Sequence, residues 1–202
     1  MEIRQLKKED AKQFSDLILN MYSNLENLEW FSPMPFDIES VKEMIDKPRF
    51  FIIGAFENGE LAGVSSLDYK CGKLVGKVEF PQDCNTEKLV EIGFNLVNTR
   101  FQGRKIMQSM IEFLIDKLKL DGFENAFVKI HKDNIASQKS CRNKGFELWK
   151  DFKKPVSKQD FINLASQSFF SKTGKENAKK TLEKFKNNEE IIVDYQILIK
   201  KI

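Results

Sequence analysis

The sequence has few of the residues that build disulfide frameworks and zinc sites. It contains 3 Cys and 1 His, and Cys71, Cys84 and Cys141 are widely spaced without a Cys-x-x-Cys pair. An odd number of separated cysteines with a single histidine forms neither a disulfide scaffold nor a zinc ligand set. We therefore expect reduced thiols, no bound metal and a cytoplasmic location.

Long apolar runs and a surplus of one charge sign are also missing. No stretch approaches the roughly 18 apolar residues that a membrane span requires, and no apolar signal core follows Glu2 and Arg4. The 33 basic and 30 acidic residues give a net charge of +3, far from the strong basic surplus typical of nucleic-acid-binding domains. These absences predict a soluble protein without a membrane partner and disfavour nucleic acid as a partner. A local basic patch for an anionic ligand remains compatible with them.

The composition that is present, 41% hydrophobic and 31% charged, is typical of a globular chain that buries one core. We therefore expect a single domain over residues 1–202. Hydrophobic periodicity predicts an α/β order with mixed strand pairing. The predicted strands are 1–6, 50–56, 61–69, 74–80, 88–97, 125–130, 146–152 and 190–200, and the predicted helices include one capped by Asp10, 39–46, 104–120, 134–144 and two within 157–188.

A loop that leads into the predicted helix 104–120 has the chemistry of a phosphate site. Gly103 lets the backbone approach a ligand closely, and the first N–H groups of a helix lack intrahelical partners. Arg100, Arg104 and Lys105 add three cations at the positive end of the helix dipole. This combination suits a diphosphate. From these features alone, a core helix with solvated basic residues is an equal alternative.

Two motifs resemble the GCN5-related N-acetyltransferase (GNAT) family. Gln102 and Gly103 match the opening of its pyrophosphate loop, and Asn134 with the Gly145-Phe146 pair matches its second motif at the usual spacing. The resemblance covers residues 1–152. It implies an α/β (α+β) fold with a mixed, mostly antiparallel central sheet flanked by helices. The segment 157–188 is then an extra helical insertion before the last strand.

The loop departs from the family pattern at two positions. That pattern places Gly at 105 and Gly or Ala at 107, where this chain has Lys105 and Met107. Lys105 can add a charge to the pyrophosphate only if its side chain swings away from the cradle. The resemblance therefore implies an atypical version of the loop.

The resemblance also implies where acetyl-CoA binds. The cofactor would lie between the strand ending at Val97 and the strand 125–130, which splay apart, with strand-like pairing of the pantetheine arm. Asn134 would bond the pantetheine, although an N-cap role is compatible with the same position. The predicted cofactor-binding residues are Leu96, Val97, Gln102, Gly103, Arg104, Lys105, Ile106, Met107, Asn134, Ser137 and Lys139.

The implied activity is acetyl transfer to an amine acceptor, either a small molecule or a protein. An amine attacks only as the free base, so a general base should take its proton. Glu91 shares a strand face with Gly93 and Asn95 and is the predicted base, with an exposed strand carboxylate as the alternative. Asp68 and Glu79 are weaker candidates.

The general acid is harder to assign from the sequence. Many family members carry a Tyr four residues before the Gly-Phe pair, where this chain has Cys141. A thiol can donate a proton, so Cys141 is a candidate acid. Packing on Phe146 is the alternative, and solvent would then protonate the CoA thiolate.

Several functional alternatives stay open. The missing Tyr and the altered loop also fit a non-catalytic acyl-CoA-binding or regulatory module with the same fold. An interaction domain that uses the basic helices is a third reading. The lysines of 157–188 usually mark a solvated helix face; the segment could instead cover the acceptor site or form a homodimer contact. Trp30, Phe31 and Met34 are candidates to line the acceptor pocket, or else to close the core as a lid.

Overall fold

A computed structural model gives the arrangement of the chain, and it describes residues 1–202 except 26, 32–33, 71–77, 163–171 and 186–187. Its strands are β1 Glu2–Gln5, β2 Phe50–Glu57, β3 Glu60–Asp68, β4 Leu89–Val97, β5 Asn125–His131, β6 Glu147–Ser157 and β7 Glu190–Lys201. Its helices are α1 Ala11–Asn24, α2 Ile38–Asp46, α3 Ile106–Leu120, α4 Ile135–Arg142 and α6 Lys172–Phe185, with a short 3₁₀ helix η2 at Leu28–Trp30.

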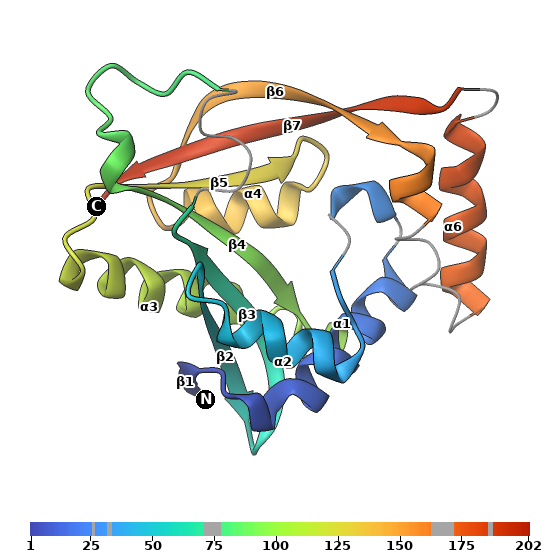
Figure 1. Ribbon diagram of the computed structural model, residues 1–202, viewed down its shortest axis with the longest axis horizontal. Coiled ribbons are helices and arrows are strands. Elements are labelled where there is room, and N and C mark those ends of the chain that lie inside the picture. Colours follow the sequence, from blue (N-terminus) through green and yellow to red (C-terminus); the bar gives the residue numbers. More distant parts are fainter. Residues whose placement is uncertain (26, 32–33, 71–77, 163–171, 186–187) are drawn as a thin grey trace.

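The strands form one seven-stranded sheet in the order β1-β2-β3-β4-β5-β7-β6 (Figure 1). Neighbouring strands are antiparallel except β4 and β5, which are parallel. The mixed, mostly antiparallel sheet predicted from the sequence is therefore confirmed. The last strand in the chain, β7, lies between β5 and β6. The segment that links β6 to β7 therefore connects two strands that pair with each other.

The parallel pair β4–β5 separates partway along its length. Pairing runs from Leu89 opposite Asn125 to Glu91 opposite Phe127, and no later pair is formed between these two fully described strands. Beyond that point β4 carries a bulge at Phe94, which has a φ of 49° and coincides with a register shift against β3. A bulge adds twist and unpairs the strand locally. The two strands therefore diverge toward their carboxyl ends, as the resemblance implied.

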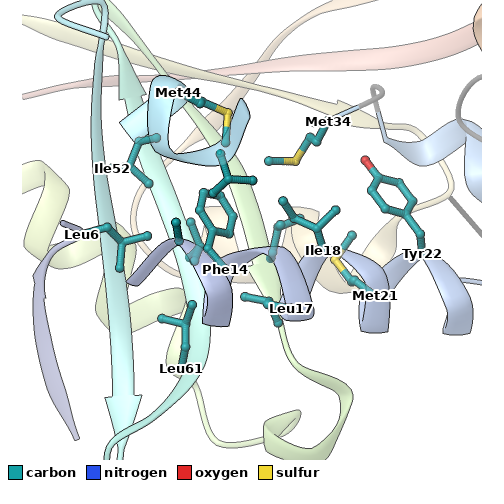
Figure 2. Close-up of a cluster of buried hydrophobic side chains, with 14 of the residues drawn as sticks. Leu6, Phe14, Leu17, Ile18, Met21, Tyr22, Met34, Met44, Ile52 and Leu61 are labelled. Atoms are coloured by element: carbon teal, nitrogen blue, oxygen red, sulfur yellow. The ribbon is translucent and has the colours of Figure 1, made fainter. Parts of the chain in front are cut away.

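Helices cover both faces of the sheet because each has one apolar stripe. On one face, α1 buries Phe14 and Ile18 against Ile52 of β2 (Figure 2), and α6 adds Ala178 and Phe185 to the same cluster. On the other face, α3 packs a second cluster against the sheet. Its buried residues are Ile106, Met110, Ile111, Leu114, Ile115 and Leu118.

The start of α3 is seated directly on β3. A Cβ atom added at Gly63 would lie 2.9 Å from Leu96 O, 3.0 Å from Met110 Cε and 3.1 Å from Ile106 Cγ2. Only a glycine leaves room for this approach. The first turn of α3 is therefore held close to the end of β4.

Several element boundaries differ from those predicted. The helix expected at 104–120 begins at Ile106, because Lys105 is in the left-handed region with a φ of 59°. Strand β6 continues to Ser157, beyond the predicted end at 152, because it pairs with β7 along that whole stretch. Most of the strand expected at 74–80, and part of the first helix expected within 157–188, lie outside the described residues. Within the described residues, no helix is both long enough and apolar enough to cross a membrane.

Candidate active site

The loop between β4 and α3 has a backbone that glycine favours at two positions. Gly103 has a φ of 79°, and a Cβ added there would meet no atom within 4 Å. Lys105 also has a positive φ, 59°, at the N-cap of α3. This is the position at which the family pattern has glycine. The chain therefore keeps the glycine-type backbone while carrying a lysine, at a conformational cost of about 1–2 kcal/mol.

The same loop presents backbone donors to a pocket. The first backbone hydrogen bond into α3 runs from Ser109 N to Lys105 O at 3.1 Å. Among the described residues, the N–H groups from Gly103 to Gln108 meet no protein acceptor. These residues line a cavity of about 520 Å³ together with Gln102. Unpaired N–H groups at a helix start bind phosphate oxygens, so this loop fits a pyrophosphate.

The arginines of the loop are held by the hairpin that joins β2 to β3. Arg104 Nη1 lies 2.8 Å from Glu57 Oε2, and Arg100 Nη2 lies 2.6 Å from Glu60 Oε2. Arg104 and Lys105 line the cavity, whereas Arg100 does not. The expectation of three cations around one point is therefore wrong for Arg100. Its guanidinium is paired instead with Glu60 of the hairpin.

Helix α4 brings its predicted residues to the opposite wall of the cavity. Asn134 caps α4, since its Oδ1 accepts from Ser137 N at 3.2 Å, and the amide can still donate from Nδ2. Asn134, Ser137 and Lys139 line the cavity, and Val97 lies on the β4 side. Except for Leu96, all of the predicted cofactor-binding residues thus surround one cavity.

A second cavity, of about 160 Å³, lies where β4 and β5 diverge. Glu91 and Leu96 of β4 line it, together with Lys129 of β5. The two cavities share five lining residues, so they adjoin. The shared residues are Trp30, Phe31, Asn95, Asn134 and Ser137.

Glu91 lies in a charged cluster on one sheet face. Its Cα partner across β3 is Asp68, which accepts a 2.7 Å hydrogen bond from Arg49 Nε. Burial raises the pKa of Glu91, and the neighbouring Asp68 acts in the same direction, while Lys129 and Arg49 oppose the rise. A carboxyl with a raised pKa is a better proton acceptor once ionised.

His131 is a pocket residue that the sequence did not single out as functional. It lines the second cavity, and its ring centroid is 5.9 Å from that of Trp30 and 5.7 Å from that of Tyr195. Its Nδ1 accepts from Asp133 N at 3.1 Å, which places the proton of the neutral ring on Nε2. Burial lowers the pKa of His131, so the ring is neutral near pH 7. A single histidine that belongs to no recognisable motif gives no signal in the sequence.

Cys141 is the one predicted catalytic residue that the structure places elsewhere. It is fully buried in the cluster beneath α3, with Phe146, and lines neither cavity. Burial raises the pKa of its thiol to about 12. The thiol packs as a small apolar side chain, which was the alternative interpretation, and we do not retain it as a general acid.

Comparison of the sequence with known proteins supports the family resemblance of the two motifs. Residues 18–146 match the acetyltransferase (GNAT) family. A search of curated proteins by sequence found no match.

Solved structures share the fold over the whole chain. A ribosomal-protein-alanine N-acetyltransferase from Brucella melitensis has 14% identity and a TM-score of 0.67, with 100% of both chains covered. An N-acetyltransferase from Staphylococcus aureus Mu50 has 16% identity and a TM-score of 0.65, over 99% of this chain and 97% of that one. The microcin C7 self-immunity acetyltransferase in complex with acetyl-CoA and AMP has 18% identity and a TM-score of 0.64, over 100% and 93%. With the family match covering most of its length, this chain belongs to the GNAT acetyltransferase family.

Proposed function

We propose that this protein transfers an acetyl group from acetyl-CoA to a primary amine, with Glu91 as the general base. The observation that carries the proposal is the junction of the two cavities. One contains the loop of unpaired N–H groups and the other contains Glu91, and they adjoin at Asn95 and Asn134. A cofactor in the first can therefore present its acyl end to an amine in the second.

The larger cavity supplies contacts along the whole cofactor. The backbone N–H groups from Gly103 to Met107 would hold the pyrophosphate, with Gln102 beside them and with Arg104 and Lys105 adding charge. Val97 would pair with the pantetheine arm, and Asn134 would donate to it from Nδ2. Ser137 and Lys139 lie on the same wall and complete the site.

Glu91 would act on the acceptor rather than on the cofactor. Acetyl-CoA supplies an acetyl group on a thioester, and the acceptor nitrogen must lose a proton as its C–N bond forms and the C–S bond breaks. The Glu91 carboxylate takes that proton, directly or through one water. Its raised pKa strengthens it as an acceptor. With Cys141 buried, the departing thiolate takes its proton from solvent.

The lining of the smaller cavity supports an amine carried on an apolar body. Trp30, Phe31, Met34, Phe50 and Phe94 all line it, together with Glu91 and Asp68. Aromatic walls beside carboxylates bind both the body and the ammonium of such a ligand. Among the structural neighbours, the Brucella melitensis enzyme is named for the alanine of a ribosomal protein, so an N-terminal peptide amine belongs in the test beside small amines.

Release of free CoA thiol from acetyl-CoA, measured over a panel of amines, tests the proposal. We expect turnover with at least one amine, and loss of about 10²–10⁴-fold in kcat for Glu91→Gln. Acetyl-CoA affinity, measured by calorimetry, should be retained in the same variant. Glu87→Gln is the matched control, because Glu87 is exposed and precedes β4. Full activity of Glu91→Gln would remove Glu91 from the mechanism.

The burial of Cys141 also favours a second candidate, a non-catalytic acyl-CoA-binding module. That candidate predicts tight acetyl-CoA binding without thiol release for any amine, and with the same affinity in Glu91→Gln. Since both candidates predict retained affinity in Glu91→Gln, the thiol assay separates the two functions, and calorimetry establishes that acetyl-CoA is bound.

A further inference from the structure

The segment that joins α1 to α2 forms a wall of both cavities. Leu25, Trp30 and Phe31 line the larger cavity, and Trp30, Phe31 and Met34 line the smaller one. Its regular structure among the described residues is the single 3₁₀ turn η2. One turn does not hold a position by itself, so the location of Trp30 depends on tertiary contacts.

Helix α6 of the insertion contacts the first part of this segment at two points. Asn177 Nδ2 donates to Leu25 O at 2.8 Å, and Lys184 Nζ donates to Glu29 Oε1. Strand β7, which follows the insertion, adds a third contact, a 3.0 Å hydrogen bond from Tyr195 Oη to Glu29 O. Figure 1 shows α6 beyond the end of α1, at the margin of the sheet.

The contact between Lys184 and Glu29 differs from the other ion pairs of the helices. The Glu29 side chain is only 6% exposed, while Lys184 is 49% exposed. The second carboxylate oxygen, Oε2, is buried and has no hydrogen-bond partner among the described residues. Removing the ammonium would leave a buried carboxylate without its counter-charge, which is strongly unfavourable. At a pH where the carboxylate stays ionised, it would move toward water and carry its neighbour Trp30 with it.

We propose that α6 positions the shared wall of the active site through Lys184, and that the insertion thereby sets the shape of the acceptor pocket. Lys184 is a positioning residue: it touches Glu29, which in turn precedes Trp30 on η2. The inference about the wall stands on these contacts alone. Its kinetic consequence rests on the proposed acetyl transfer.

A fluorescence experiment tests the position of the wall without any turnover. The chain has 2 Trp, so a Trp149→Phe background leaves Trp30 as the single tryptophan, which is excited selectively over the tyrosines at the red edge of the absorption band. In Lys184→Met, acrylamide quenching of Trp30 should rise about two-fold, because the uncompensated carboxylate opens the wall. Lys180→Met, which removes an exposed lysine of the same helix, should quench as the background does.

Paired variants separate positioning from a general loss of stability. In Glu29→Gln/Lys184→Met no buried charge remains, so quenching should return to the background value. Lys184→Arg keeps the charge and should also quench normally, whereas Lys184→Gln should open the wall. If Lys184→Met does not fold, the comparison of Lys184→Gln with Lys184→Arg tests the proposal instead. Unchanged quenching in Lys184→Met and Lys184→Gln would overturn the proposal, as would a double variant as open as the single.

Kinetics with the whole 202-residue chain test the consequence for the acceptor. Lys184→Met should lower kcat/KM for the amine about ten-fold and change KM for acetyl-CoA less than about three-fold, because the loop that would hold the pyrophosphate precedes α3 and is not part of the wall. Equal losses for both substrates would overturn the acceptor assignment. Absence of turnover in the wild-type protein would instead contradict the proposed function. The quenching result would still test whether Lys184 positions the wall.

Discussion

Lys105 shows at a single residue how this chain departs from its family and what the departure costs. Its left-handed backbone, with φ 59°, suits glycine. We predict that Lys105→Gly raises the free energy of unfolding by about 1 kcal/mol, measured by urea denaturation. Lys105→Ala removes the same charge but keeps the strained backbone, so it should bring no such gain. Equal stability of the two variants would show that the backbone is not strained.

Glu91 is the residue at which pH should separate catalysis from stability. Its pKa is raised by burial, so between the unfolded and the folded pKa the folded state binds more protons. Folding stability therefore falls as pH rises through that window, and activity rises, because the base must be ionised. We predict that Glu91→Gln is more stable than the wild type at pH 8, with the difference shrinking toward pH 5. Urea unfolding across that pH range measures it, and a difference that grows on acidification would contradict the assignment.

At the scale of elements, the close contact of α3 with β3 controls the position of the cradle. Gly63→Ala places a Cβ 2.9 Å from Leu96 O, a backbone atom that cannot rotate away. We predict a loss of about 1–3 kcal/mol in unfolding free energy, together with weaker acetyl-CoA binding as Ile106 shifts. Gly93→Ala is the control for stability, because its Cβ would meet only Ser66 Oγ at 3.7 Å.

Elements were also the part of the structure that the sequence predicted best. The apolar stripe of α3 located the helix within two residues of its observed start, and Asn134 has the N-cap role that was the alternative interpretation of this residue. Periodicity reports which side chains are buried, so it finds helices and strands. It carries no information on a single dihedral angle, and therefore missed the bulge at Phe94 and the left-handed Lys105.

Contacts between residues distant in sequence were not predictable either, because periodicity carries no information on which elements meet. The pairing of Arg100 with Glu60 depends on the final placement of the β2–β3 hairpin. The contact of Trp30 with His131 depends on how η2 is placed against β5. The cofactor residues were found because two local motifs carried them. The acceptor wall was named only as a possibility, because it has no motif of its own.

At the scale of the whole molecule, the cofactor should stabilise the folded state by mass action. Acetyl-CoA at 100 times its dissociation constant should add about 2.7 kcal/mol, which corresponds to a rise in Tm of about 5–10 °C for a chain of this size. A thermal-shift titration measures it, with pantetheine as the control that lacks the pyrophosphate. No shift at saturating acetyl-CoA would contradict the cofactor assignment.

The hairpin that joins β2 to β3 gives the protein an internal counter-ion. Glu57 and Glu60 already neutralise Arg104 and Arg100, so the field that an arriving pyrophosphate meets is weaker than the cations of the loop would suggest. A diphosphate that forms an ion pair with Arg104 must break the pair between Arg104 and Glu57. By thermodynamic reciprocity, any interaction that strengthens the pair between Arg104 and Glu57 lowers the affinity for the diphosphate. The loop should therefore bind tightly those anions that also accept hydrogen bonds from its backbone N–H groups. It should bind less tightly those anions that interact through charge alone.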